Sequence, residues 1–522
     1  MATLALGVLV VLIASALVGM LFFAGGMIYA CKVTFLLSNW MLLLIALAVV
    51  AGFVAFARSR VGLRLALWIR ERGGIIDRAS LLATFILFCA LALIVRRYAF
   101  VTGWDSWHII SDALNLLTGE PIDLQYFSAY PNNLLLLRFV ELCVWVAQQL
   151  GVTSYQAGVL VVCAFNCASC ALAAWLTYRL LAELVGRGWG IVGWLLVAVV
   201  VGGSPWLGIA YSDPIVVCLP ILQLFLFERS MKADGSKRAI LWMSMGLLAY
   251  VAYAIKPQAA FVPIAVVLFC CVRIAASSIR ERSLGSLRHD LPCAASFVAG
   301  MAVSIMLVGA VVAPVRARLD TDASVGIPHY FMMGLNPTTM GIYSLDDVTY
   351  SVSQPDQGTR TRANLEEAGR RLIAYGPTGV AELMARKLMT NFNDGTFAWG
   401  MEGGFFENAD PNVDGMLTRL IRSFYYPGGA NYELWRTSAQ GMWIGVLSLG
   451  LIGVACELVQ ARRGGGVSDV VVVLAGTLVM LILFELIFEA RARYLFSSVP
   501  LFCVLAVLGL RAVRLQGSSR SL

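Results

Sequence analysis

The chain has 522 residues, of which 59% are hydrophobic and only 13% are charged, and its mean hydropathy is +0.80. A water-soluble fold has too little interior to hide so much apolar surface, so the composition predicts an integral membrane protein. The formal net charge of +8 does not indicate a nucleic-acid partner, because most basic residues fall in short clusters between apolar stretches, as the positive-inside rule requires.

The apolar stretches predict an all-α, polytopic membrane protein. Segments 4–29, 41–57, 293–312 and 470–488 are long enough, at about 1.5 Å per residue, to cross a hydrocarbon core of roughly 30 Å. They lack the alternating pattern of an outer-membrane barrel strand. The first stretch has no Lys or Arg ahead of its apolar core, so we interpret it as a retained span and not as a secretory signal.

The basic clusters predict the orientation of the spans. Clusters at 57–78, 227–238, 273–290, 461–466 and 511–522 are expected in the cytoplasm, which leaves the polar regions 97–133, 211–214, 315–440 and 489–494 facing outward. This arrangement needs about twelve spans with both termini in the cytoplasm, and it requires one apolar stretch between 134 and 206 not to cross.

Segment 134–150 is the weakest span candidate, because it contains Arg138, Glu141 and two glutamines. We expect it to form a helix along the outer interface, with the arginine and the glutamate one turn apart. The alternative is that this segment crosses and that an adjacent pair of stretches forms a re-entrant hairpin.

Three regions follow from this pattern. Residues 1–314 form an N-terminal transmembrane module that contains the long outer loop 97–133, residues 315–440 form an extracytoplasmic loop domain, and residues 441–522 form the C-terminal transmembrane helices. Two amphipathic helices are expected within the loop domain, separated by Gly376 and Pro377. The twelve cysteines lie mostly inside apolar segments, which argues against a disulfide framework.

The loop 97–133 contains a candidate catalytic acid. A carboxylate beside large aromatic rings is partly desolvated, which raises its proton affinity and suits it to accept a proton from a hydroxyl. Asp105 is therefore a candidate general base. The structural alternative is that the tryptophans mark an interfacial belt and that Asp105 caps a helix beginning near Ser106. The polar and aromatic residues of this part of the loop are Trp104, Asp105, Trp107, His108 and Asp112.

A second acid, Asp213, follows Tyr211 and Ser212 at the outer mouth of a span, directly before Pro214. A helix N-cap is the structural interpretation of this residue. The functional one is that Asp213 and Asp105 face the same side of the membrane, so that both bound one site, with or without a bridging divalent cation.

Basic residues on the outward side suggest a specific role, because the positive-inside rule disfavours them there. Lys256 lies at the outward end of a span, where it indicates either an anionic ligand or simple snorkelling to headgroups. Arg491 and Arg493 follow Glu489 between two spans and suggest a phosphate clamp, since the guanidinium fork matches phosphate oxygens. A structural Glu–Arg pair that locks two helices is the competing interpretation.

The order of these motifs resembles the GT-C superfamily of polyprenyl-phosphate-sugar-dependent glycosyltransferases, close to the family 39 protein mannosyltransferases. The resemblance rests on "GWDSWHI", "AYPNN", "YSDP", the "KP" after a span and the late "EARARYLFSSVP". It implies a GT-C-like bundle of transmembrane helices with outer juxtamembrane helices and one extracytoplasmic loop domain. Relatives usually carry a tandem acidic pair, whereas Ser106 follows Asp105 here.

The resemblance also implies roles for individual residues. Asp105 matches the presumed catalytic base, with Asp112 as the fallback, and Asp213 matches a second acid that in some relatives helps to bind a metal or the acceptor. Arg491 and Arg493 match the region that holds the lipid-linked phosphate. The other expected substrate-binding residues are Trp104, Trp107, His108, Tyr130, Asn132, Tyr211, Lys256 and Tyr494, and Tyr126 and Trp399 are further candidates for stacking on sugars.

The expected function is that of an inverting hexosyltransferase of the cell membrane, with its site on the extracytoplasmic side. The donor is a sugar on a polyprenyl phosphate, the acceptor is a hydroxyl of a glycan, lipid or protein, and the surrounding partners are membrane lipids without nucleic acid. The resemblance implies no certain cofactor, and the one candidate is a divalent cation near Asp105 and Asp213. The alternative is a transporter or flippase of a lipid-linked or anionic solute, which predicts charges near the bilayer midplane and internal pseudo-symmetry.

Overall fold

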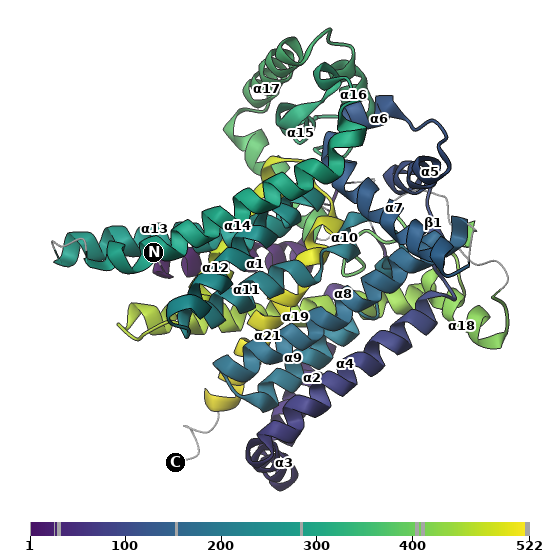
Figure 1. The fold of residues 1–522 in the computed structure, drawn as a ribbon. Coiled ribbons are helices and arrows are strands. Elements are labelled where there is room, and N and C mark those ends of the chain that lie inside the picture. The colour runs from purple at the N-terminus through teal and green to yellow at the C-terminus, as the bar shows by residue number, and fades with distance from the viewer. Residues whose placement is uncertain are drawn as a thin grey trace.

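The computed structural model describes residues 2–23, 25, 27–28, 33–151, 155–281, 285–401, 407–408 and 413–516. The basic tail from 517 onward and part of the cluster at 273–290 lie outside the described residues. The protein is built almost entirely of helices, and its long apolar helices run side by side in one bundle (Figure 1).

Eleven helical segments of the described chain are long and apolar enough to cross a membrane, and the shorter apolar helix α9 is a twelfth candidate. The chain is therefore a polytopic helical membrane protein, as the composition predicts. The helices that supply these segments are α1 (Ala2–Phe22), α2 (Asn39–Arg58), α4 (Gly73–Val95), α8 (Tyr155–Leu184), α9 (Arg187–Val200), α11 (Cys218–Met231), α12 (Gly235–Ile255), α13 (Phe261–Glu281), α14 (Gly285–Arg316), α19 (Tyr432–Arg462), α20 (Asp469–Ile487) and α21 (Val499–Gln516).

Close packing of small residues joins some of these helices. Gly246 of α12 lies against the carbonyl oxygen of Phe297, and Gly300 of α14 lies against that of Met243, so close that a Cβ atom on either glycine would overlap the facing backbone. Such small-residue contacts let two membrane helices approach by backbone packing alone.

Shorter elements lie between the spans. Figure 1 shows α15, α16 and α17 gathered at one end of the bundle, beside α5 and α6. These shorter elements are α3 (Arg60–Glu71), β1 (Phe100–Val101), α5 (Asp105–Thr118), α6 (Leu124–Ala129), η3 (Pro131–Asn133), α7 (Leu134–Gln149), η4 (Pro205–Gly208), α10 (Ser212–Ile215), η5 (Pro257–Ala260), η6 (Thr321–Ala323), α15 (Gly326–Met333), α16 (Leu345–Val352), α17 (Gln357–Phe392), β2 (Glu407–Asn408), α18 (Met416–Tyr425) and η7 (Ala492–Ser498).

The helices α7 and α17 show two details that the sequence predicts. The helix α7 covers the doubtful segment 134–150, has 16 residues, and carries the predicted ion pair between Arg138 and Glu141. The helix α17 is broken at Gly376, whose φ of 60° and ψ of 179° are non-helical, so the predicted pair of helices around Gly376 and Pro377 is confirmed.

The division into three regions stays a prediction, although one boundary differs from the helices observed. The span α19 begins at Tyr432, inside the segment 315–440. The end of α17 is also tied into the bundle by buried amides, since Asn393 Oδ1 accepts hydrogen bonds from Asn39 Nδ2 at 2.8 Å and from Gln440 Nε2 at 2.9 Å. Buried amides paired in this way hold a fixed register between helices.

Candidate active site

Asp105 is the first residue of α5, and its carboxylate is directed toward a neighbouring loop. The N-cap of α5 is Trp104, and no side chain caps this helix end, so the alternative that Asp105 serves as an N-cap is wrong. Instead, Asp105 Oδ2 accepts a hydrogen bond of 2.9 Å from the phenolic hydroxyl of Tyr211. Burial, with the charge of Asp105, raises the pKa of Tyr211 far above its usual range, so this phenol remains a proton donor.

Backbone pairing brings these two residues together across more than a hundred positions of sequence. Phe100 of β1 bridges to Ile209 in a parallel pairing, and Ser106 Oγ donates a 3.0 Å hydrogen bond to the carbonyl oxygen of Ala210. The amide of Asn166, a buried residue of α8, donates to the carbonyl oxygen of Ile209 at 2.8 Å. The loop that carries Tyr211 is thus held by α8 on one side and by the start of α5 on the other.

Asp213 lies in the first turn of α10 and is completely buried. The N-cap of α10 is Tyr211, so the N-cap interpretation of Asp213 is wrong. Lys256 Nζ lies 2.6 Å from Asp213 Oδ1, and Arg493 Nε lies 3.8 Å from Asp213 Oδ2. Lys256 is only 5% exposed, so it does not snorkel to headgroups. One buried carboxylate therefore holds two cations from distant segments.

Arg493 also lies among aromatic rings. Its guanidinium carbon lies 4.9 Å from the ring centre of Trp104, 5.5 Å from that of Tyr211 and 5.4 Å from that of Tyr494. The rings of Trp104 and Tyr211 meet edge to face at 4.7 Å. Stacking of this kind fixes the plane and direction of a guanidinium group. Arg493 thereby connects the acid of the outer loop to the buried Asp213.

The remaining residues of the late motif point in different directions. The hydroxyl of Tyr494 donates a 2.9 Å hydrogen bond to Glu489 Oε2, and the Tyr494 ring lies 4.9 Å from Lys256 Nζ. Arg491 is half-buried and donates a long 3.5 Å hydrogen bond to the carbonyl oxygen of Met401. The two arginines therefore lie on the same short segment but have different neighbours.

A second group of outer-loop residues surrounds Tyr126. The His108 ring stacks on the Tyr126 ring at 4.4 Å, and His108 Nδ1 lies 3.5 Å from Asp123 Oδ2. Asn133 Nδ2 donates to the Tyr126 hydroxyl at 2.8 Å, and Asn132 is tied in turn to Asn133 Oδ1 at 3.2 Å. Burial, followed by the charge of Asp105, raises the pKa of Tyr126 well above its usual range. Tyr126 is thus a second phenol close to the candidate base.

Three further tyrosines are influenced by the charge of Asp105, one from the loop 97–133 and two from the segment 315–440. Burial, followed by the charges of Asp105 and Glu489, raises the pKa of Tyr343. Burial is also the main cause of the raised pKa of Tyr130, about 12, and of Tyr330, with smaller contributions from a neighbouring tyrosine and from the same two acids. The charges of both acids therefore act on all three hydroxyl groups. Tyr330 and Tyr343 were not expected at the site, because nothing in their local sequence distinguishes them from other tyrosines.

Three of the expected residues have other surroundings. Asp112 accepts hydrogen bonds from the backbone N–H of Asp123 and from the amide of Asn115, so it holds the loop, and burial raises its pKa. Trp107 is 44% exposed. Trp399 is buried, with its indole N–H bonded to the carbonyl oxygen of Tyr425, so the expectation that it stacks on a sugar is wrong.

The donor set does not fit a divalent cation between Asp105 and Asp213. The ammonium group of Lys256 lies directly against Asp213, and the carboxylate of Asp105 is bonded to Tyr211. In the part of the chain that the structure describes, no three His, Cys, Asp or Glu side chains lie close enough together to hold a metal ion. Cations already in place would repel a metal at this position.

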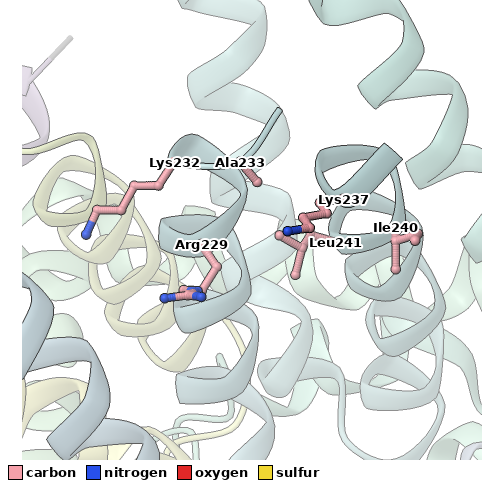
Figure 2. Close-up of a pocket in the computed structure, with 6 residues that line it drawn as sticks. All are labelled: Arg229, Lys232, Ala233, Lys237, Ile240 and Leu241. Atoms are coloured by element: carbon pink, nitrogen blue, oxygen red, sulfur yellow. The ribbon is translucent and has the colours of Figure 1, made fainter. Parts of the chain in front are cut away.

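A cavity of about 510 Å³ lies at one end of the span Ser212–Met231, and Asp213 lies at the other end. Figure 2 shows its lining, with Lys237 and Leu241 pointing toward the helix that carries Arg229 and with Lys232 extending away from them. Asp213 and this cavity belong to opposite ends of the apolar segment Ser212–Met231. The cavity is therefore on the other side of the bundle from Asp105. Its full lining is Arg229, Lys232, Ala233, Lys237, Ile240 and Leu241.

Two solved structures resemble the fold at low similarity. The archaeal oligosaccharyltransferase AglB from Archaeoglobus fulgidus, in complex with an inhibitory peptide and a dolichol-phosphate, is 12% identical with a TM-score of 0.39; the alignment covers 85% of this chain and 51% of that chain. ArnT from Cupriavidus metallidurans, bound to undecaprenyl phosphate, is 14% identical with a TM-score of 0.33, over 81% of this chain and 77% of that one. This chain thus spans about half the length of the archaeal protein.

The comparison of sequences defines the family. No curated protein matches the chain. A family model described as "conserved hypothetical integral membrane protein" matches residues 3–513, nearly the whole sequence. That match agrees with the apolar helices described above, and the chain belongs to this family of integral membrane proteins.

Proposed function

We propose that this protein is an inverting glycosyltransferase that moves a sugar from a polyprenyl-phosphate donor to an acceptor hydroxyl on the outer face of the cell membrane. The observation that carries the proposal is the cluster in which Tyr211 donates a hydrogen bond to Asp105 and faces Arg493 with its ring, at the ends of several spans. An acid and a permanently charged cation, held side by side next to the bilayer, match the two requirements of transfer from a lipid phosphate.

Asp105 is the proposed general base. The residue is only partly buried, and the hydrogen bond from Tyr211 fixes the direction of its carboxylate. In the proposed reaction the acceptor oxygen attacks the anomeric carbon while its proton passes to Asp105. The bond between the anomeric carbon and the phosphate oxygen breaks, and polyprenyl phosphate leaves with that electron pair. A single displacement of this kind inverts the anomeric configuration.

The arginines of the late motif are the proposed phosphate ligands. Asp213 pairs with both Lys256 and Arg493, so these three side chains together carry one net positive charge. Lys256 is buried against Asp213, whereas Arg493 is stacked between Trp104 and Tyr211 beside the candidate base. We assign the direct contact with the donor phosphate to Arg493 and assign Lys256 to the charge balance that holds Arg493. Arg491, two residues earlier on the same segment, is the second proposed phosphate ligand.

Aromatic side chains are the proposed sugar-binding surface. Trp107 is 44% exposed, and the stacked pair of His108 and Tyr126 lies on the same segment of the chain, with Tyr130 next to Tyr126. Flat rings of this kind pack against the apolar faces of sugars while their polar edges accept or donate hydrogen bonds. Family 39 membership and the nature of the sugar remain predictions.

The distribution of charge favours an enzyme over a flippase. Asp213 is the second residue of its span, Lys256 lies between two spans, and Glu485 is two residues from the end of α20. These charges therefore lie at the ends of membrane segments, whereas a transport path predicts charged residues near the midplane.

The experiment is a donor-side assay that does not require the acceptor to be known. Purified protein in nanodiscs is incubated with a panel of polyprenyl-phosphate sugars and a cell-envelope extract, and release of polyprenyl phosphate is measured by mass spectrometry. Release that depends on the protein and on one class of donor supports the proposal. Movement of intact donor between the leaflets of vesicles, with no release, would support the flippase instead.

A further inference from the structure

The helix α18, residues Met416–Tyr425, is strongly amphipathic, and its polar side faces the protein. Thr418 is completely buried, and its hydroxyl accepts a 3.0 Å hydrogen bond from Arg97 Nη1. In return, Arg422 Nε donates a 2.8 Å bond to the backbone carbonyl oxygen of Arg97. In a helix on the surface of a water-soluble protein, the polar side would face outward and the apolar side would be buried. Here Thr418 and Arg422 face the protein, together with the partly buried Ile421 and Tyr425, while other apolar residues of the helix are exposed.

The outward side of α18 is apolar. Met416 is 84% exposed, Leu417 is 53% exposed and Leu420 is 50% exposed. At 100° per residue, Leu417, Leu420 and Phe424 fall on one stripe, and Thr418 and Arg422 fall on the other. Arg419, 69% exposed and paired with Asp414 at 3.3 Å, lies nearly opposite Leu417 at this spacing, on the polar side of the helix. An exposed apolar stripe opposite basic residues is typical of a helix in a membrane interface.

The spans next to α18 indicate how deep the helix lies in the membrane. Arg97, which it binds, is the second residue after the span Gly73–Val95, and the span Tyr432–Arg462 begins seven residues after α18 ends. Leu93 in the first span is 66% exposed and Leu434 in the second is 52% exposed, so the apolar stripe of α18 continues the exposed apolar surface of both spans at these ends. Figure 1 shows α18 at the side of the bundle, near the end of α4 and β1.

We infer that α18 lies in the plane of the outer leaflet, with Leu417 and Leu420 against phospholipid acyl chains and Arg419 at the level of the headgroup phosphates. This inference does not depend on the proposed glycosyl transfer. It assigns a phospholipid-binding surface to a helix that the sequence motifs do not mark.

This surface is joined mechanically to the loop of Asp105. Arg97, which α18 binds, lies three residues before the start of β1. The ring of Phe100 in β1 packs on the ring of Tyr426 at 4.6 Å. At the end of the helix, the Tyr425 hydroxyl donates to the carbonyl oxygen of Gly203 at 3.2 Å, and Gly203 lies in the loop that leads to Tyr211. The helix therefore contacts both segments that meet at the Asp105–Tyr211 hydrogen bond. Contact of α18 with lipid would fix the depth of these two segments relative to the membrane.

The test places a fluorescent non-canonical amino acid at position 417 or, as the matched control on the polar edge, at position 419. The full-length protein is studied in nanodiscs, with phospholipids brominated along the acyl chains as the lipid quencher and iodide as the aqueous quencher. We expect brominated lipid to quench the probe at 417 severalfold more than iodide does, and the probe at 419 to show the opposite order.

Two outcomes overturn the inference. Quenching of position 417 by iodide and not by brominated lipid means that the stripe faces water. Protection of position 417 from both quenchers means that protein, such as a second copy of this chain, covers it. Near-ultraviolet circular dichroism and size-exclusion behaviour of each labelled variant establish that the fold is retained, and because neither probe replaces a buried residue, misfolding is not expected.

Discussion

The hydroxyl group of Tyr211 and the carboxylate of Asp105, 106 positions apart in sequence, form a 2.9 Å hydrogen bond at one end of the bundle. The same tyrosine ring faces the guanidinium group of Arg493 at 5.5 Å. Tyr211 thus contacts both the acid and the cation of the candidate site.

Tyr211→Phe removes the donor that directs the Asp105 carboxylate and keeps the ring beside Arg493. Because a hydrogen bond to a charged group contributes about 1.5–3 kcal/mol, we expect the rate of transfer to fall by roughly tenfold to a hundredfold. Steady-state release of polyprenyl phosphate measures this. Tyr494→Phe, which removes the hydroxyl bonded to Glu489, is the matched control and should lose less. Wild-type rates in Tyr211→Phe would show that the bond has no part in catalysis.

Arg493→Lys keeps the charge but loses the flat guanidinium group that lies against Trp104, Tyr211 and Tyr494. A lysine cannot reproduce the stacked, forked geometry, so we expect the KM for the donor to rise about tenfold, a cost of about 1.4 kcal/mol, with a smaller effect on kcat. Arg419→Lys, on an exposed arginine, should leave both constants unchanged. An unchanged KM in Arg493→Lys contradicts the assignment of this residue to the donor phosphate.

Lys256→Met leaves the buried carboxylate of Asp213 without its nearest cation. Breaking one side of a buried ion pair costs about 3–5 kcal/mol, so this variant should unfold at a much lower temperature than wild type. The double variant with Asp213→Asn should recover a large part of the loss, because the unpaired charge is gone. Thermal unfolding in detergent, followed by intrinsic fluorescence, measures both effects. Strictly additive losses would mean that the two residues do not interact.

Lys387 makes stability depend on pH. It is completely buried on α17, and burial lowers its pKa from 10.5 to about 7, partly offset by the charges of Glu485 and Glu489. Between these two values the folded lysine has lost its proton while the unfolded one keeps it, so the unfolded state binds more protons and the free energy of unfolding rises with pH. Below about pH 7 this gain is absent.

The measurement compares the pH dependence of thermal unfolding in wild type and Lys387→Met. The rise from about pH 7 toward pH 10 should be weaker in the variant, since groups other than Lys387 titrate alike in both proteins. Arg386→Met, at the neighbouring surface position that pairs with Glu382, should keep the wild-type slope. An equal slope in Lys387→Met and wild type is the result that contradicts this prediction.

Much of the fold could be predicted from the sequence, because membrane spans depend on local composition. Long apolar stretches and basic connectors indicated the helical bundle, and the Gly376 break was visible from one glycine followed by one proline. The crossing status of 134–150 stays a prediction, since α7 has 16 residues and amphipathic character. Length and charge alone cannot distinguish a short tilted span from an interfacial helix.

The candidate site was predictable only in part. Asp105, Asp213, Lys256 and Arg493 were recognised as charges at the edge of the bilayer, and the structure brings them together. Their pairing could not be predicted, because it depends on the backbone bridge at Ile209 and on contacts across more than a hundred residues. Trp399 was assigned wrongly for the same reason, since an outward tryptophan and a buried one have the same local sequence.

The role of Asp105 as the general base is tested by comparing transfer by wild type, Asp105→Asn and Asp112→Asn under saturating donor. We expect Asp105→Asn to remain folded but to lose about 10²–10⁴-fold in rate, the usual contribution of a general base. Asp112→Asn, which alters a carboxylate that holds the loop, should retain most of the activity and lose some stability. Full activity in Asp105→Asn, or loss of transfer in Asp112→Asn alone, would show that Asp105 is not the base.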